Sequence, residues 1–328
     1  MLLAMLSLLQ IVVLRLRLRR RERHTEHCVN KWRSVLNMAL AGETLMELLP
    51  LPKKEVPQFL KLWLHFQISL RGGTRDLLND IARRLGADAL ARTLLKHGNR
   101  SERALAALTL GYLADRSSLE AMQQLSVDPD RLLSFHARWA LLQIDPEAAA
   151  RHAVRALVSG EWSVLETGGV LQENRPAVQA ALLEALPHER EVEGLTRLLQ
   201  LADVLDLSPP GEMLLPLLLH TEMEVKAGAL KLCVDPVLKP VVLELMSHQN
   251  WRVRLQAVKA LGRFAQPEDV SAMARLLADR EWWVRYRSAQ ALAQLPFLDR
   301  SDMEALAEKA NDSFARDIMR QVLAESAV

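Results

Sequence analysis

The sequence has only two cysteines, Cys28 and Cys233, among its 328 residues. Two thiols cannot form the disulfide framework of a small secreted domain or the ligand set of a cysteine-rich metal fold. Valine, isoleucine and threonine are sparse beside leucine, alanine, arginine and glutamate, which favours helix over strand. Glycine and proline together number 27, too few for a collagen-like or low-complexity chain. The composition therefore indicates a folded, largely helical protein.

Recognisable catalytic motifs are missing as well. The chain contains neither G-x-G-x-x-G nor G-x-x-x-x-G-K-[ST], so no nucleotide site is expected. The histidines are scattered, and their spacing suggests no Ser-His-Asp or Cys-His pairing. His24, His27 and Cys28 would share one helix face, but the neighbouring arginines would repel a cation, and a solvated helix is the simpler interpretation. We therefore expect a protein that is not an enzyme and that needs no cofactor and no metal.

Positive charge is concentrated in one short segment. Between residues 15 and 33, eight basic residues oppose two acidic ones, a charge of +6, and since the whole chain carries +2 the remainder carries −4. The predicted membrane-surface cluster in this segment consists of Arg15, Arg17, Arg19, Arg20, Arg21 and Arg23. Such a cluster favours contact with anionic lipid headgroups. A nucleic-acid-binding arm is the alternative.

The apolar run at residues 1–14 precedes this cluster and has no charged side chain. As a helix it would reach ~21 Å, short of the ~30 Å hydrocarbon core, although snorkelling arginines would extend it. A secretory signal would place the basic residues before the apolar run. The positive-inside rule predicts a single-pass protein of the inner (cytoplasmic) membrane, with its N-terminus outside and the remainder in the cytoplasm. A misassigned start codon, or a segment that only lies on the membrane, would explain the same run.

After Trp32 the chain reads as a string of short helices. We expect an apolar membrane-anchor segment at 1–14, a basic juxtamembrane helix at 15–48, capping helices at 53–86 and a repeat region at 87–328. The helix from Val56 to Leu70 is apolar around its circumference and should be buried on two sides. No strand-like alternation bounded by turn signals appears, so the predicted fold class is all-α.

The second half of the chain repeats itself. Residues 250–264 align without gaps to 281–295, an offset of 31 that pairs Trp251 with Trp282. Ala-Leu pairs or their equivalents recur at 107–108, 140–141, 181–182, 229–230, 260–261 and 291–292. A helix pair cannot bury its apolar face alone, so the pairs must stack. The pattern predicts an α-solenoid of stacked antiparallel helix pairs.

These residues resemble the HEAT repeat family. The shared motif is a V-R-x-x-A-x-x-A-L helix after a turn marked by Asp or Pro, as at Asp235-Pro236, Gln266-Pro267 and Asp279. The resemblance implies a solenoid whose usual work is protein–protein scaffolding. The layout as a whole also resembles uncharacterised bacterial membrane-anchored HEAT repeat proteins, on the residues RLRLRRRER at 15–23, LKLWL at 60–64 and WWVRYRSAQAL at 282–292.

Aromatic residues and arginines gather at the starts of two successive repeat helices, and these residue types anchor protein interfaces. The candidate partner-binding residues are Trp251, Arg252, Trp282, Trp283, Arg285, Tyr286 and Arg287. The alternative is that Trp251 and Trp282 pack between repeats, while Arg254 and Arg285 pair with acidic residues of the adjacent turn. The segment DVLDLSPPGE at 203–212 is either a plain connector or a projecting loop that could touch a partner.

The sequence favours a non-enzymatic scaffold or adaptor at the cytoplasmic face of the inner membrane. It would recruit a partner, such as an envelope enzyme or a signalling protein, through the solenoid surface, and bind anionic lipid through the Arg cluster. The alternatives are a HEAT-like enzyme of lyase or DNA glycosylase type, and a nucleic-acid binder that uses the Arg-rich arm. A glycosylase needs a strongly basic groove, whereas the body of this chain carries −4. We therefore expect a protein partner and no nucleic acid.

Overall fold

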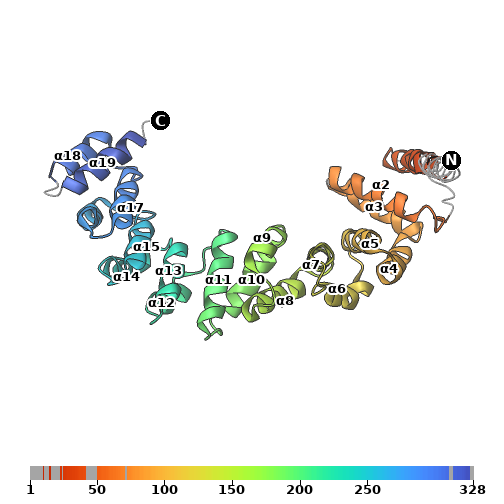
Figure 1. Ribbon diagram of the computed structural model, residues 1–328, viewed down its shortest axis with the longest axis horizontal. Coiled ribbons are helices and arrows are strands. Elements are labelled where there is room, and N and C mark those ends of the chain that lie inside the picture. Colours follow the sequence, from red (N-terminus) through yellow and green to blue (C-terminus); the bar gives the residue numbers. More distant parts are fainter. Residues whose placement is uncertain are drawn as a thin grey trace, which may run out of the picture. The chain divides into compact units, whose positions relative to one another are not determined.

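The computed structural model describes residues 10, 15, 23, 25–41, 50–70, 72–309 and 313–325. Within these residues every regular element is a helix, and successive helices form stacked antiparallel pairs (Figure 1). The contacts divide the chain into two units, residues 1–149 and 150–328. The predicted all-α solenoid class is confirmed. The segment boundaries expected at 14, 48, 53 and 86 stay predictions.

The first unit contains a helix at residues 25–40 and the elements that follow it up to α7. These elements are α2 (Val56–Ser69), α3 (Gly73–Arg84), α4 (Ala87–His97), α5 (Arg100–Tyr112), the 3-10 turn η1 (Arg116–Ser118), α6 (Leu119–Leu125) and α7 (Arg131–Ile144). Helix α5 packs against both α4 and α7. Helix α8 (Pro146–Ser159) crosses the boundary between the units.

Helix α2 is buried on two sides, as its apolar circumference predicts. On one side Trp32 of the 25–40 helix meets Phe59 edge-on, with ring centroids 5.1 Å apart. On the other side Trp63 is fully buried and its indole Nε1 donates a hydrogen bond of 2.9 Å to the carbonyl of Leu78 in α3. The Trp63 ring also lies 6.3 Å from that of Tyr112 in α5, at an interplanar angle of 88°. Aromatic packing therefore holds the N-terminal helices together.

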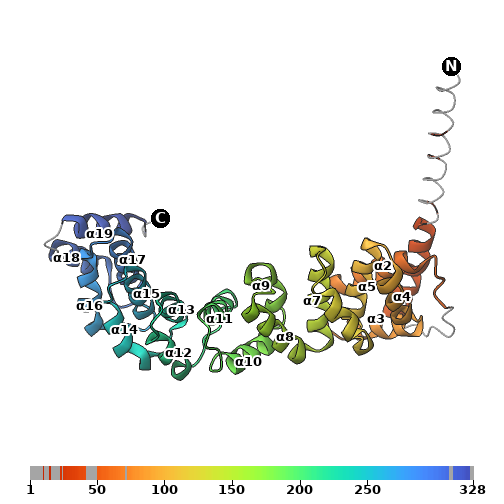
Figure 2. The ribbon, with the colours of Figure 1, turned by 60° about the horizontal axis from the view of Figure 1, so that its bottom comes forward.

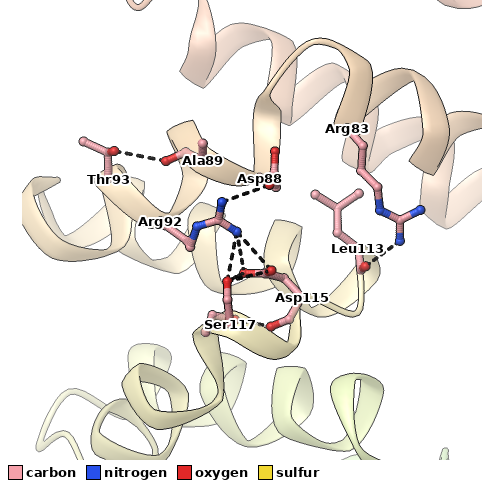
Figure 3. Close-up of polar contacts among 9 residues, drawn as sticks. Arg83, Asp88, Ala89, Arg92, Thr93, Leu113, Asp115 and Ser117 are labelled. Atoms are coloured by element: carbon pink, nitrogen blue, oxygen red, sulfur yellow. Dashed lines mark hydrogen bonds and ion pairs between the residues drawn. The ribbon is translucent and has the colours of Figure 1, made fainter.

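Arginine side chains fasten the turn after α5 to the preceding helices (Figure 3). Arg92 of α4 donates to Asp88 one turn earlier, at 2.9 Å, and to both carboxylate oxygens of Asp115, at 3.0 Å each. Arg83 of α3 donates to the carbonyl of Leu113, at 2.8 Å. The bond to Leu113 satisfies a carbonyl that the end of α5 leaves without an intrahelical partner, and the bonds of Arg92 tie α4 to the turn that follows α5.

The second unit is a row of helices in which α12, α14 and α16 lie along one side and α13, α15 and α17 along the other (Figure 2). Its elements are α9 (Val164–Gln172), α10 (Arg175–Ala185), α11 (Val192–Val204), α12 (Gly211–Leu218), α13 (Met223–Leu232), η2 (Pro236–Leu238), α14 (Lys239–Leu245), α15 (Trp251–Leu261), η3 (Pro267–Asp269), α16 (Val270–Arg275), η4 (Leu276–Ala278), α17 (Trp282–Ala293), α18 (Arg300–Lys309) and α19 (Ser313–Glu325). The turns marked by Asp235-Pro236 and Gln266-Pro267 become the 3-10 turns η2 and η3.

Short polar side chains fix several helix starts. The Asn99 side chain accepts the N–H of Glu102, and the Glu102 carboxylate accepts the N–H of Asn99, forming a capping box at α5. Asp130 caps α7 by accepting the N–H of Leu132, at 2.9 Å. Asn250 caps α15 by accepting the N–H of Arg252, at 2.9 Å. Each cap satisfies a donor that the first turn leaves open.

The connector at 203–212 packs against its own unit. Leu205 and Leu207 are buried, and so is Pro209, while the residues between them are exposed. Arg175 of α10 donates a hydrogen bond to the carbonyl of Asp206. The alternating burial favours the plain-connector interpretation over a projecting loop.

The basic N-terminal helix is packed over part of its length. Cys28, Trp32, Leu36 and Ala39 form one buried stripe on the 25–40 helix, at helical spacing. Lys31 and the Trp32 indole both bind Glu55, at 3.1 and 2.7 Å. The expectation of a fully solvated helix around Cys28 is therefore wrong, because this thiol faces the interior of the unit.

The predicted single-pass inner-membrane localisation is contradicted. Among the helical residues that the structure describes, none of the helices combines the length and apolarity needed to cross a bilayer. The apolar run of 1–14 was already short for a span, at ~21 Å against ~30 Å, and apart from Gln10 it lies outside the described residues. Of the predicted membrane-surface cluster, Arg15 and Arg23 are described and exposed; Arg17, Arg19, Arg20 and Arg21 lie outside the described residues.

Candidate functional site

The helices α13, α15 and α17 begin with the same structural pattern. Their starts are separated by 28 and then by 31 residues. When the three helices are aligned at their starts, three sets of equivalent positions are buried in all of them. The first set is Val225, Val253 and Val284; the second is Ala229, Ala257 and Ser288; the third is Cys233, Leu261 and Leu292. The Ala-Leu pair at 229–230 thus corresponds to 257–258, an offset of 28, whereas the sequence comparison pairs it with 260–261, an offset of 31. A shift by one helical turn preserves much of an apolar helical pattern, so the sequence comparison fitted the other register as well.

Arg254 fastens the start of α15 to the turn before α17. Its Nε and Nη2 each donate to the Asp279 carboxylate at 2.7 Å, and its Nη1 donates to the carbonyls of His248 and Gln249. Both charged side chains are more than nine-tenths buried. Burial alone would raise the pKa of Asp279, but the hydrogen bonds from Arg254 and from the N–H of Glu281 hold it below its ordinary value. Arg254 therefore has a structural role, as the alternative interpretation proposed.

Arg285 occupies the equivalent position one helix later, but the bonds recorded for it go to backbone carbonyls and not to an acidic side chain as the alternative interpretation expected. Its Nη1 donates to the carbonyls of Asp279, at 2.7 Å, and Arg280, at 3.2 Å. Its guanidinium lies 5.5 Å from the centroid of the Phe314 ring in α19. Arg285, one of the predicted partner-binding residues, thus helps to hold successive helices together.

A groove runs across α11, α13, α15 and α17, with a volume of about 540 Å³. It is lined by Thr196, Leu199, Gln200, Asp203, Met223, Glu224, Ala227, Gly228, Lys231, Trp251, Arg252, Leu255, Gln256, Lys259, Trp283 and Arg287. Four of the seven predicted partner-binding residues are among them. Small side chains at 227 and 228 deepen the middle of the groove, since a Cβ added to Gly228 would lie 3.0 Å from Leu199 of α11.

Aromatic rings form the C-terminal end of this groove. Trp283 lines it with half its surface exposed, and Trp282 beside it is 40% exposed. The Trp282 ring stacks on Tyr286 with centroids 5.0 Å apart, and meets Trp283 edge-on at 4.7 Å. The Tyr286 hydroxyl donates to Glu325, and this bond raises the pKa of the phenol. Trp282 and Tyr286 therefore support the position of Trp283 from outside the groove lining.

Arg252 and Arg287 stand on the groove wall beside these aromatics. The Arg252 guanidinium lies 5.6 Å from the centroid of the Trp251 ring, within the range of a cation–π interaction. Arg287 donates to the amide oxygen of Gln290, at 2.6 Å. Their charges are thus held in place by neutral groups.

Sequence reasoning missed the polar residues that α11 and α13 add to the groove. Lys231 and Lys259 are separated by 28 residues and occupy the same position in α13 and α15. Asp203 of α11 lies 3.4 Å from the Lys231 ammonium. The signal that could have found the lysines was the 28-residue offset, which the more conspicuous Ala-Leu pairs concealed.

In the described part of the chain, no three His, Cys, Asp or Glu side chains are grouped so that they could hold a metal ion. The groove instead offers aromatic surface, fixed cations and an apolar floor. Chemically this arrangement can bind a ligand by desolvation and by charge.

Comparison with known proteins identifies the region that contains α13, α15 and α17, three of the four helices of the groove. The family model for HEAT repeats matches residues 212–326. None of the curated proteins matches the chain. Among solved structures, the crystal structure of an engineered protein from the Northeast Structural Genomics Consortium is similar, at 18% identity and a TM-score of 0.37 over 84% of this chain and 85% of that one. A likeness of that degree carries no argument. The family match and the repeated starts of α13, α15 and α17 show that residues 212–326 of the chain are HEAT repeats.

Proposed function

We propose that the chain is a non-enzymatic scaffold that recruits a partner protein into the groove on α11, α13, α15 and α17. HEAT repeats generally mediate protein interactions. The observation that carries the proposal is the exposure of Trp283 on the groove wall, with Arg252 and Arg287 beside it. Exposed Trp and Arg side chains that converge on a concave surface are the usual anchors of a protein interface.

The enzyme alternatives fit the groove less well. A DNA glycosylase needs a wall of cations along the phosphate backbone, whereas Asp203 and Glu224 interrupt this one. A lyase would need acid and base groups placed against a bound substrate. Lys259, the lining residue whose pKa is shifted, is surrounded by the cations Arg287, Arg263 and Lys231, and the nearby Asp203 carboxylate is already paired with Lys231.

The test is site-specific photo-crosslinking in cells. A photoreactive phenylalanine analogue at position 283 lies on the groove wall, and the same analogue at position 237 is the matched control. Val237 in η2 is more exposed than Trp283 but lies outside the groove. We expect one discrete protein to crosslink from position 283 and not from 237.

The captured protein is then purified and its affinity measured against the Trp251→Ala, Trp283→Ala double variant. Loss of at least tenfold in affinity would place the partner in the groove. No crosslink from position 283, or the same proteins from both positions, would overturn the proposal.

A further inference from the structure

The groove holds more positive charge than its own carboxylates neutralise. Four cations line it, Lys231, Arg252, Lys259 and Arg287, against two carboxylates, Asp203 and Glu224. Lys231 has an ion pair there, with Asp203. Among the described residues, no carboxylate lies within ion-pair distance of the other three cations. The groove is therefore prepared for an anionic ligand.

The environment of Lys259 agrees with this charge balance. Burial lowers the pKa of Lys259, and repulsion from Arg287, Arg263 and Lys231 lowers it further, while Asp203 acts in the opposite sense. A cation that is partly desolvated among other cations gains more from an incoming carboxylate than an exposed lysine does. Lys259 stands in the middle of the groove, on α15.

The uncharged part of the lining is mostly apolar, with Thr196, Gln200 and Gln256 as its polar side chains, and it offers contact area to an apolar side chain of the ligand. Leu199, Leu255 and Trp251 form the floor, and Trp283 stands at one end with half its surface open. Cations share the helices of these apolar side chains, Arg252 and Lys259 on α15 and Arg287 on α17. A ligand that satisfies both must alternate carboxylates with apolar groups.

The length of the groove fits a short stretch of extended chain. It crosses four helices, and three steps of ~9 Å between helix axes make ~27 Å. At ~3.3 Å per residue, about eight residues of extended peptide cover that distance. Nucleic acid is disfavoured because it carries a phosphate on every nucleotide and would bring some of them against Asp203 and Glu224, whereas a peptide can place neutral residues there.

We propose that the groove binds an extended acidic segment of a partner protein, in which carboxylates flank an aromatic or aliphatic side chain. The proposal rests on the proposed scaffold function and names the chemistry of its partner. The carboxylates pair with Lys259, Arg252 and Arg287, and the apolar side chain packs between Trp251 and Trp283.

Random peptides displayed on phage are selected on the purified full-length chain. We expect the enriched peptides to be net acidic and to contain an aromatic or aliphatic residue. A synthetic peptide of the enriched sequence is then titrated into the protein. Its affinity should fall about tenfold or more in Lys259→Glu and in Trp283→Ala, and should weaken as the salt concentration rises.

The matched control is Arg275→Glu, which makes the same change of charge sign at an exposed residue outside the groove. Arg252→Glu, at an exposed residue of the groove wall, provides a second groove variant in case Lys259→Glu unfolds. Equal affinity for Arg275→Glu and wild type, with loss in the groove variants, supports the proposal. Equal loss in all charge variants would overturn it.

Three results would overturn the acidic-segment proposal: enrichment of basic or neutral peptides, no enrichment at all, or tight binding of single-stranded DNA that depends on Trp283. Failure of the scaffold function is seen separately, in the crosslinking from position 283. A discrete crosslinked partner together with basic enriched peptides would retain the scaffold and reject the acidic segment.

Discussion

The two units place their aromatic residues differently. In the first unit Trp63 is fully buried, and Tyr112 lies between Trp63 and Trp139 at centroid distances of 6.3 and 4.7 Å. In the second unit Trp282 and Trp283 begin a helix of the same kind and are 40% and 51% exposed. Trp, Tyr and Arg side chains that stay exposed to solvent mark a surface for another molecule. The comparison therefore assigns packing to Trp63, Tyr112 and Trp139 and recognition to the aromatics at the start of α17.

The units also differ in how arginine joins their helices. Arg92 in the first unit keeps a third of its side chain exposed while it binds Asp88 and Asp115. Arg254 in the second unit binds Asp279 with 8% and 7% of the two side chains exposed. A buried pair is costly to break on one side because a charge is then left without a partner. The second unit thus contains an ion pair with both partners buried, whereas Arg92 in the first unit makes part-exposed ones.

The chain carries a thiol in each unit with which to measure these differences. Cys28 is buried in the first and Cys233 in the second. Burial raises the pKa of Cys28, and raises that of Cys233 to about 11. Since the thiolate is the reactive form, each thiol should label only when its own unit opens. Labelling of Cys28→Ser and Cys233→Ser variants in urea then gives the free energy of unfolding of one unit at a time.

The largest effect is expected from Trp63→Ala. It leaves a cavity in the core of the first unit and removes the hydrogen bond to Leu78, so the free energy of unfolding of that unit should fall by about 3–5 kcal/mol. Labelling of Cys28 measures the loss, and labelling of Cys233 is the control. A loss below about 1 kcal/mol would contradict the packing role of Trp63.

Arg254→Ala comes next and tests the second unit. It leaves the Asp279 carboxylate buried without its partner. The free energy of unfolding of the second unit, measured by labelling of Cys233, should therefore fall by about 3 kcal/mol. The matched change Arg92→Ala should lower the free energy of unfolding of the first unit, measured by labelling of Cys28, by about 1 kcal/mol, because the Arg92–Asp115 pair is part-exposed. If the two variants lose equal stability, the contrast between the units is wrong. Replacing both partners, as Arg254→Met with Asp279→Leu, should recover most of the loss.

The two units should also differ in how their free energies of unfolding change as the solution is acidified. A carboxylate whose folded pKa is lowered stabilises the fold above its ordinary pKa, and that stability is lost as pH falls through the folded value. The pKa of Asp279 is lowered, and hydrogen bonding to Arg100 lowers that of Asp130 in the first unit to about 2. Between about pH 5 and pH 3, the free energy of unfolding of the second unit should therefore depend less on pH in Asp279→Asn than in the wild type.

Asp130→Asn should do the same for the first unit with a smaller effect, because Arg100 and Asp130 lie at the surface. The measurement uses an activated pyridyl disulfide, which still reacts with thiols in acid, to label Cys28 for the first unit and Cys233 for the second. An unchanged slope in Asp279→Asn would show that other groups control the acid response.

Much of the fold was accessible from sequence, because helical periodicity and turn residues act locally. Pro57 lies in the first turn of α2, and Pro236 and Pro267 begin the 3-10 turns between repeats. The register of α13 was not accessible, since Ala229-Leu230 fits two alignments one turn apart. The burial of Cys28 depends on α2, which follows it by almost 30 residues in sequence. The groove was only half predicted, because its aromatics are conspicuous in sequence whereas Lys231 and Lys259 are ordinary until the helices are aligned.

The smallest expected effect on stability sharpens the comparison most. Trp283→Ala removes an aromatic side chain as large as that of Trp63, but one that keeps half its surface in solvent. It should change the free energy of unfolding of the second unit by no more than about 0.5 kcal/mol on the Cys233 signal. The same variant should lose about tenfold or more in affinity for the groove ligand. A residue that is dispensable for folding and indispensable for binding has a recognition role. A destabilisation comparable to that of Trp63→Ala would instead return Trp283 to the core and remove the argument for the groove.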